Sequence, residues 1–454
     1  MKNLDKNVLI DFETRILNML QGKMHLMQPH DERVALVSVA LEHLLDKETN
    51  ADLKQAFSTP SSRVLFIERF LSYGIVTEIL SDLDTEDVII NGLKPIYVHH
   101  GKKGFISTRI SFSSERELDL FIKKLLLFSG RHRMGKIINL ELAHLEGRVN
   151  IVASSFGPQV TITKAKVSPF SIIDLIRSGT LTHEVAGQLW LYIEGMNIRP
   201  ANIIIAGGPG VGKTTLLNAL FSFIPQEHRT VVIEDTLELN TFLEESCSRL
   251  ESDDDLSLAD LVKNSLRMRP ERIVVGEVRG EEAKDMITAC NIGKYCMGTI
   301  HALTSREAII RLQNIPMNIP EMLLNLIDVF IVLKRYHVNG QVYRVVDEIS
   351  ETSGMEQLKI LLSQVFKYNY DTREIRQVNP STVYRDRLAH QSGLLPRDIM
   401  KEHLLRSFLL KQLDERNIST VKEVTTFCHA YSRNPAAAVA GLGHDREQLL
   451  GNKK

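Results

Sequence analysis

The sequence predicts an α/β protein: a parallel sheet covered by helices, preceded by a smaller α+β domain and followed by a mostly helical extension. Two observations predict the sheet. Short β-branched runs alternate with helical segments in the central part of the chain, at 203–205, 231–233, 273–275 and 298–300. That alternation is typical of a parallel sheet with helices on its faces. In addition, a glycine-rich loop joins the first of these runs to the helix that follows it.

The part of the chain before this sheet is expected to contain two segments. Residues 1–75 carry apolar clusters at irregular spacing and are predicted to be helical. Residues 76–165 are predicted to form the small α+β domain. Asn91-Gly92 between two apolar runs indicates a hairpin. Ser114 and Glu117 form a candidate capping box at the start of an amphipathic helix.

The remaining boundaries follow from changes in the pattern. Residues 166–200 are interpreted as a linker that includes a helix, and residues 201–350 as the domain built on the parallel sheet. Residues 351–454 are predicted to form a hairpin, turning at Asp371-Thr372, and then helices.

Composition excludes several classes of protein. The 454 residues include 55 Lys and Arg against 56 Asp and Glu. A chain this close to neutral lacks the broad basic field of a general nucleic-acid binder, so no general nucleic-acid binding is expected. The four cysteines form no Cys-x-x-Cys pair, which argues against a structural zinc site and favours a reducing cytosol.

The sequence contains no segment with the pattern of a membrane anchor. Residues 1–23 lack the apolar core of a signal peptide. The longest apolar stretch, 322–333, is interrupted by Asn325 and Asp328 and is shorter than the roughly 20 residues that span a bilayer. Any role at a membrane is therefore expected to be peripheral.

The strongest chemical signal is a loop that matches G-x-x-x-x-G-K-[ST] in full, between an apolar run and a helix. Glycines let backbone N–H groups turn toward phosphate oxygens, and the helix N-terminus adds partial positive charge. Lys213 is expected to neutralise the β- and γ-phosphates of ATP, and the Thr214 hydroxyl to bind Mg²⁺. The predicted nucleotide-binding residues are Gly207, Gly208, Pro209, Gly210, Val211, Gly212, Lys213, Thr214 and Thr215.

Hydrolysis also requires acidic groups that hold Mg²⁺ and orient water. Glu234, Asp235 and Glu238 follow the second β-branched run, and Glu277 follows the third. Open α/β sheets bind ligands at the carboxyl ends of their strands, so these carboxylates are expected to face the nucleotide. The expected Mg²⁺ ligands are Thr214, Asp235 and Glu277.

Two further features lie near these strands. His301 ends the last of the four runs, and by position alone such a histidine is expected to be structural. Four arginines surround the third run and are interpreted mostly as solvated or subunit-facing, because no aromatic residue is interleaved with them as in nucleic-acid binding surfaces. They are Arg267, Arg269, Arg272 and Arg279.

Together, these motifs resemble the type II/type IV secretion ATPase superfamily. The glycine-rich loop, residues 234–238, 273–277 and 298–301 resemble, in order, its Walker A loop, Asp box, Walker B strand and His box. The segments 263–270 and 276–283 are similar to the branch that drives tight-adherence pili, archaeal pili and the archaeal flagellum. In the N-terminal domain, 87–92 and 147–150 are similar to segments of the family.

The resemblance implies a RecA-like P-loop motor domain and a ring of six identical subunits. ATP and Mg²⁺ would bind between this domain and the smaller N-terminal one. The implied partner is a polytopic platform protein of a secretion, pilus or archaellum machine, and the implied location is cytoplasmic, at the face of the cytoplasmic membrane.

The same resemblance implies roles for individual residues. Glu277 would polarise the attacking water or hold Mg²⁺. Glu234 and Glu238 would complete the acidic shell. Arg148 would reach the γ-phosphate as an arginine finger, and His301 would sense phosphate or couple subunits.

The sequence departs from the family at Thr163, where an arginine often stands before a second basic residue. Lys164 and Lys166 would substitute only in part, because lysine lacks the bidentate fork of arginine. The missing arginine leaves open a ring scaffold that binds ATP without hydrolysing it. A RecA-like nucleic-acid motor is a second alternative, against which the near-neutral charge argues.

Overall fold

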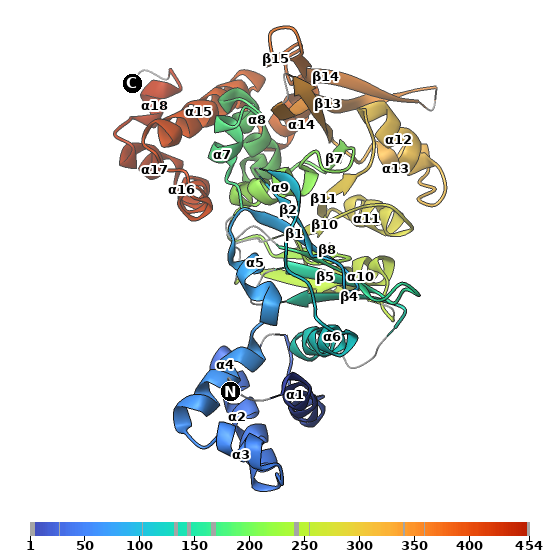
Figure 1. Ribbon diagram of the computed structural model, residues 1–454. Coiled ribbons are helices and arrows are strands. Elements are labelled where there is room, and N and C mark those ends of the chain that lie inside the picture. The colour runs from blue at the N-terminus through green and yellow to red at the C-terminus, as the bar shows by residue number, and fades with distance from the viewer. Residues whose placement is uncertain are drawn as a thin grey trace. The chain divides into compact units, whose positions relative to one another are not determined.

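The computed structural model describes residues 5–26, 28–101, 103–130, 135–142, 147–164, 169–239, 245–253, 255–338, 341–357 and 359–451. The chain divides into two compact units, residues 1–167 and 168–454 (Figure 1). Each unit has hydrophobic cores of its own.

The N-terminal unit begins with short helices. They are α1 (Lys6–Leu20), α2 (His30–Asp46), α3 (Ala51–Ala56), α4 (Pro60–Leu71), the 3₁₀ turn η1 (Gly74–Val76) and α5 (Thr77–Ser81). Their apolar faces share one core with the strands that follow, including Phe12 of α1 and Val88 of the first strand. The helices of residues 1–75 therefore pack within the same compact unit as the predicted α+β domain.

The sheet of this unit has six antiparallel strands in the order β3-β2-β1-β6-β5-β4. They are β1 (Thr85–Asn91), β2 (Tyr97–His100), β3 (Gly104–Ser107), β4 (Ile137–Leu142), β5 (Gly147–Val152) and β6 (Gln159–Thr163). The predicted hairpin at Asn91-Gly92 is confirmed, because β1 pairs antiparallel with β2. The predicted helix is α6 (Glu115–Ser129), whose first turn donates the Glu117 N–H to the Ser114 side chain.

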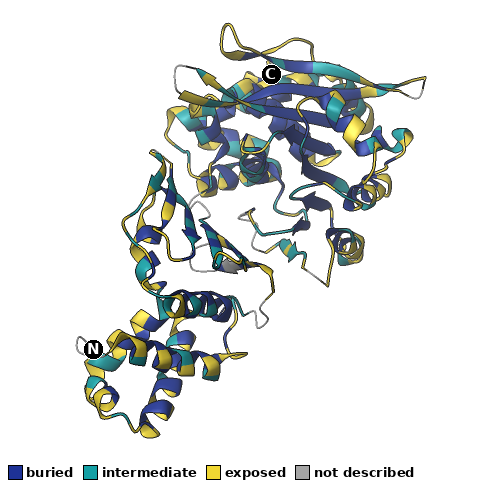
Figure 2. Ribbon diagram, turned by 45° about the vertical axis from the view of Figure 1, so that its right-hand side comes forward, coloured by how far each residue is buried: buried dark blue, intermediate teal, exposed yellow. Residues whose placement is uncertain are grey.

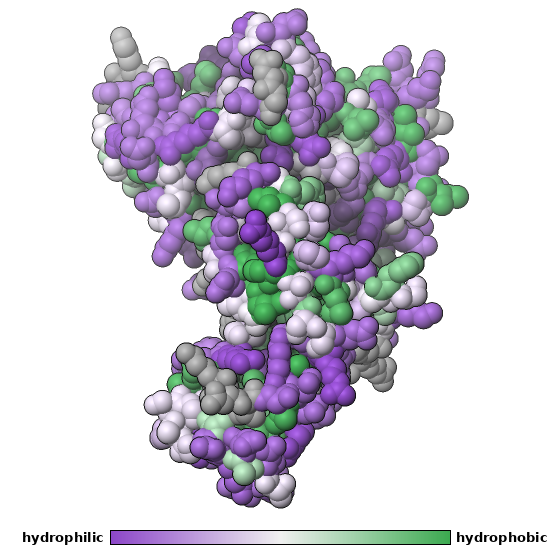
Figure 3. Space-filling view, viewed as in Figure 1, coloured by the Kyte–Doolittle hydropathy of each residue, from purple (hydrophilic) through white to green (hydrophobic). Residues whose placement is uncertain are grey.

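Large hydrophobic side chains are exposed on the sheet of the N-terminal unit. Tyr97, Phe105 and Ile137 are 45%, 68% and 67% exposed. Figure 3 shows hydrophobic residues gathered over this sheet among mostly hydrophilic surroundings. On β1 and β2 the buried positions alternate with more exposed ones, so the sheet has one face in the core and one face outside it.

The C-terminal unit is built on a nine-stranded sheet in the order β15-β14-β13-β12-β7-β11-β10-β8-β9. Six strands are parallel: β7 (Ile203–Gly207), β8 (Thr230–Glu234), β9 (Cys247–Glu251), β10 (Arg272–Val275), β11 (Tyr295–Ile300) and β12 (Val329–Val338). The parallel sheet covered by helices is confirmed, and the whole chain is a mixed α/β protein with a helical C-terminal segment.

The sheet does not end at residue 350, where the sequence interpretation placed the boundary. Three antiparallel strands continue it: β13 (Gln341–Glu356), β14 (Lys359–Asn369) and β15 (Glu374–Gln377). The hairpin predicted around Asp371-Thr372 is the β14–β15 pair. Because β13 pairs with the whole length of β12 through its residues 341–351, hydrogen bonding joins this region to the parallel strands.

Helices cover both faces of this sheet. On β7, Ile203 and Ile205 belong to one core, whereas Ile204 and Ala206 belong to the other. Burial on both faces explains why the strands are continuous apolar runs, and Figure 2 shows the central strands as buried. The helices that line the second core are α10 (Leu258–Ser265), α11 (Glu282–Asn291), α12 (Ser305–Gln313) and α13 (Glu321–Leu324).

The first core includes a segment that the sequence interpretation called a linker, residues 166–200. Within it, α7 (Ile172–Arg177) and α8 (His183–Glu194) are helices of the C-terminal unit. Trp190 of α8 is fully buried and stacks on Phe223, with ring centroids 5.4 Å apart. The linker assignment is therefore wrong for these helices, because their apolar side chains are part of the core.

The C-terminal helices pack onto the same core. They are α14 (Thr382–Ser392), α15 (Pro396–Glu415), α16 (Val421–Arg433), α17 (Pro435–Gly441) and α18 (Arg446–Leu449). At Gly187 of α8 a side chain would place its Cβ 2.7 Å from the backbone N of Ser407 on α15, so glycine permits this close helix contact. Within the described ranges, no helix combines the length and apolar character that a bilayer crossing requires.

Candidate nucleotide-binding site

The glycine-rich loop lies between β7 and α9 (Lys213–Leu220), as predicted. Gly210 and Gly212 have φ values of 68° and 97°, in the left-handed region that favours glycine. A Cβ on Gly207 would lie 2.6 Å from Cγ2 of Val211, so this position also needs glycine. Thr214 and Thr215 follow in the first turn of α9. The backbone of the loop is thus shaped as a phosphate-binding loop requires.

The Lys213 ammonium lies against this loop. Its Nζ donates to the carbonyl oxygens of Gly207 and Gly208, both at 3.0 Å, and is 3.3 Å from Nδ1 of His301. Burial lowers the pKa of Lys213, and the nearby Glu277 opposes that change. A largely buried cation held by backbone carbonyls can transfer to phosphate oxygens at little desolvation cost.

His301 and Glu277 form a pair beside Lys213. Nε2 of His301 is 3.0 Å from Oε1 of Glu277. The two residues follow the adjacent parallel strands β11 and β10, so their side chains meet at the carboxyl edge of the sheet. The His301 carbonyl also accepts a hydrogen bond from Arg311. The structure therefore brings together three of the predicted site residues in one continuous contact.

Glu234 lies deeper than the sequence suggested. Its carboxylate accepts the backbone N–H groups of Glu238 and Leu239, at 3.1 and 3.2 Å. Burial raises the pKa of Glu234 to about 7, although these N–H donors oppose the change. The Glu238 side chain, by contrast, is exposed. Glu234 therefore shapes the turn that carries Glu238, in addition to any role in an acidic shell.

Gly276 separates Glu234 from the Walker B carboxylate. A Cβ on Gly276 would lie 2.8 Å from Cγ of Glu234. Its carbonyl oxygen accepts the Thr299 hydroxyl at 2.6 Å, which ties the end of β10 to β11. Glycine before Glu277 thus leaves room for the Glu234 side chain.

Asp235 is occupied by protein partners. Its carboxylate pairs with Arg279 and accepts the Ser252 hydroxyl at 2.8 Å. To bind Mg²⁺ it would have to exchange the guanidinium for the metal. The pairing with Arg279 was missed from the sequence, where this arginine was interpreted as a surface residue.

Arg272 corrects the interpretation of the arginines around β10. Its side chain is buried rather than solvated, with 1% exposure, and its Nε donates to Nδ1 of His228 at 3.0 Å. Its Nη2 donates to the carbonyl of Ile193 near the end of α8. Arg267 and Arg269 are exposed, as expected. Arg272 therefore links β10 to the core helices and has a structural role.

The predicted residues of the N-terminal unit have partners of their own. Arg148 lies on β5, opposite Thr163 of β6. The Thr163 hydroxyl donates to the Asp87 carboxylate at 2.7 Å. Lys164 donates to the carbonyl of Asp82 at 2.8 Å. Lys166 lies outside the described residues.

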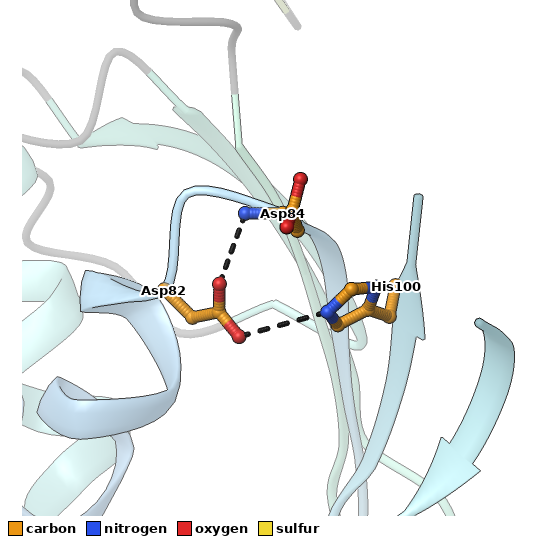
Figure 4. A group of neighbouring side chains, drawn as sticks. All are labelled: Asp82, Asp84 and His100. Carbon is orange, nitrogen blue, oxygen red and sulfur yellow. Dashed lines mark hydrogen bonds and ion pairs between the residues drawn. The ribbon is translucent and has the colours of Figure 1, made fainter. Parts of the chain in front are cut away.

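An acidic cluster with a histidine also lies in the N-terminal unit. The ligand atoms of Asp82, Asp84 and His100 are within 4.8 Å of one another (Figure 4). Nε2 of His100 is 3.8 Å from Oδ2 of Asp82, and Lys164 donates to the carbonyl of that aspartate. Because His100 and Lys164 already contact Asp82 through its side chain and its backbone, the cluster is interpreted as part of the local structure of this turn.

A glycine-rich loop between a parallel strand and a helix, with a lysine and a histidine–glutamate pair at the same sheet edge, defines a P-loop nucleotide-binding protein. Residues 130–347 match the family described as type II/IV secretion system protein. An uncharacterized protein of Methanocaldococcus jannaschii is 30% identical over 398 residues, which are 82% of this chain and 70% of that protein. This chain belongs to the type II/IV secretion system ATPase family.

Two further proteins show the range of similarity. The conjugal transfer protein TrbB of Rhizobium radiobacter is 34% identical over 172 residues, covering 37% of this chain and 52% of that protein. Among solved structures, the pilus retraction motor PilT with bound ADP has a TM-score of 0.47 at 16% identity, covering 82% of this chain and 97% of that one.

Proposed function

We propose that this protein is a Mg²⁺-dependent ATPase that powers assembly of a pilus- or archaellum-like filament, or protein secretion, through a membrane platform. The observation that carries the proposal is the contact chain Lys213–His301–Glu277 at the phosphate-binding loop, with separations of 3.3 and 3.0 Å. Family membership supports the same reaction.

The donor set fits the metal that such a reaction requires. Thr214 and Glu277 offer a hydroxyl and a carboxylate, the hard oxygen donors that Mg²⁺ prefers. When bound, Mg²⁺ neutralises charge on phosphate oxygens. Asp235 would contribute only after it releases Arg279.

The protein side chains have separate roles in binding the phosphates, positioning the water and supplying positive charge. Lys213 exchanges the carbonyls of Gly207 and Gly208 for phosphate oxygens. His301 holds the Glu277 carboxylate in place, which keeps that carboxylate in position to accept a proton from an attacking water. Arg148 supplies a positive charge from the N-terminal unit.

The first test is ATP hydrolysis by the full chain and by Lys213→Ala. We expect turnover to fall at least about a hundredfold, because the variant loses the charge that binds the transferred phosphate. Lys411→Ala, on the exposed face of α15, is the matched control and should hydrolyse ATP like the wild type. Full turnover by Lys213→Ala would overturn the catalytic assignment. ATP binding without hydrolysis by the wild type would favour a ring scaffold.

The biological role is tested in the cell. We propose a cytoplasmic hexamer that docks on a polytopic membrane protein. Deleting the gene should remove a surface filament or a secreted protein, and the wild-type gene should restore it whereas Lys213→Ala should not. Unchanged filaments and secretion would count against the assembly role, and tight, salt-sensitive DNA binding would favour a nucleic-acid motor.

A further inference from the structure

Two arginines face each other beside the phosphate-binding loop. Arg335 of β12 and Arg344 of β13 are direct cross-strand partners in the antiparallel pair, so their side chains lie on the same face of the sheet. Like charges directly opposite each other destabilise a sheet, because the Cβ atoms of such partners are only about 4.5–5.5 Å apart. Both side chains are exposed, so solvent screens part of this repulsion, and a bound anion would offset the rest.

The neighbouring carboxylates do not supply a counter-charge. The next residues along the strands, Tyr336 and Tyr343, pair on the opposite face, where their rings stack at 5.3 Å. On that face Lys334 and Lys367 both pair with Asp347, at 3.0 and 2.9 Å. Within the part of the chain that the structure describes, no ion pair joins a carboxylate to Arg335 or Arg344.

Arg344 contacts the phosphate-binding loop, and Arg335 lies close to it. Nε of Arg344 donates to the carbonyl oxygen of Gly210 at 3.0 Å. Nη1 of Arg335 lies 3.5 Å from the point where a Cβ on Gly210 would be. Because Arg344 binds the Gly210 carbonyl on the side of the loop away from the phosphates, the N–H groups of the loop can face phosphate oxygens. The two guanidinium groups therefore form a positive outer wall on a loop that binds anions.

We propose that Arg335 and Arg344 are positioning residues of the nucleotide site, and that the phosphates of the bound nucleotide are their missing counter-charge. Arg344 holds the loop through the Gly210 carbonyl. Both guanidinium groups raise the positive potential at the loop, so they favour the triphosphate over nucleotides with fewer phosphates. The inference rests on the proposed function and adds to it a source of selectivity for phosphate charge.

The test compares the affinities of the full chain for ATP, ADP and AMP by calorimetry at low ionic strength. Arg335→Gln should weaken ATP binding about three- to tenfold, with a smaller loss for ADP and almost none for AMP, because the lost attraction scales with phosphate charge. Arg335→Lys keeps the charge and should bind ATP within about twofold of the wild type. Arg373→Gln is the control: this guanidinium lies 5.9 Å from the Tyr343 ring centroid and should leave all three affinities unchanged.

Thermal unfolding separates a charge effect from a folding defect. Without nucleotide, Arg335→Gln should melt no lower than the wild type, since it relieves repulsion from Arg344. With saturating ATP it should gain less in melting temperature than the wild type does. Equal losses for ATP and AMP, or a lower melting temperature without nucleotide, would overturn the inference.

Lys213→Ala distinguishes failure of this inference from failure of the proposed function. If Lys213→Ala loses ATP binding while Arg335→Gln binds like the wild type, the arginine pair has no role and the ATPase proposal stands. If Lys213→Ala instead turns over ATP like the wild type, the proposed function fails, and the inference that rests on it fails with it.

Discussion

At the scale of single residues, the site depends on a contact that only glycine permits. Gly276 leaves space for the Glu234 side chain, whose Cγ would lie 2.8 Å from an added Cβ. Gly276→Ala should displace either Glu234 or the strand end that carries Glu277, and should lower ATP turnover at least about tenfold. Steady-state hydrolysis by the purified variant measures this. Gly441→Ala, where no atom lies within 4 Å of the added Cβ, is the control. Normal turnover by Gly276→Ala would contradict the packing argument.

A second residue-scale prediction concerns pH. Burial raises the pKa of Glu234 from 4.5 to about 7, so the folded protein holds a proton that the unfolded chain releases between these values. The contribution of this group to the free energy of unfolding therefore falls as pH rises from 4.5 to about 7, by about 3 kcal/mol at most. Urea unfolding across this range should show a flatter pH dependence for Glu234→Gln than for the wild type. Identical slopes would show that this carboxyl titrates normally.

At the scale of secondary-structure elements, a buried ion network joins α8 to α15. Arg406 is 2% exposed; its Nη2 is 2.6 Å from Glu194, and Nη1 also pairs with Glu402. Coulombic attraction to both carboxylates raises the pKa of this guanidinium, although desolvation acts in the opposite direction. Removing it would take the ion-pair partner away from buried Glu194, whereas Glu402 would keep its pair with Arg446.

Arg406→Ala should therefore lower the free energy of unfolding by about 3–5 kcal/mol. Urea denaturation followed by circular dichroism measures the change. The matched control is Arg433→Ala: its ion pair with Glu227 is more than half exposed on both sides and should contribute about 1 kcal/mol or less. If the free energy of unfolding falls by the same small amount in both variants, the α8–α15 contact does not depend on this network.

At the scale of the whole molecule, the two compact units carry different parts of the proposed chemistry. Residues 168–454 contain the phosphate-binding loop and its histidine–glutamate pair, together with their own cores. Arg148 lies in the other unit. A fragment of residues 168–454 should therefore fold and bind ATP within about tenfold of the full chain, yet hydrolyse it at least about a hundredfold more slowly.

Circular dichroism, calorimetry and steady-state hydrolysis on the fragment test this. Full-chain Arg148→Ala should reproduce the slow hydrolysis while it keeps the fragment's affinity. A fragment that turns over ATP at the full rate would remove Arg148 and the N-terminal unit from the proposed reaction. An unfolded fragment would contradict the independence of the two cores.

Local patterns determined much of this protein from the sequence alone. The phosphate-binding loop, the four central strands and the β14–β15 hairpin depend on residues that are neighbours in the chain, so spacing and glycine chemistry were enough to predict them. The same motifs identified the family. Residues 172–194 were expected to include a helix but were assigned to a linker, because their burial depends on partners that are distant in the chain.

Only the tertiary structure decided which side chains meet. Three features illustrate this: Asp235 pairs with Arg279, Arg272 is buried, and Arg344 contacts Gly210. Each depends on segments that are far apart in the chain or that are brought together by the order of the strands. Sequence spacing carries no information about these contacts, because they depend on which strands are neighbours and on the register between them. The chemistry available to the site was therefore determined by the sequence, whereas its arrangement was decided by the fold.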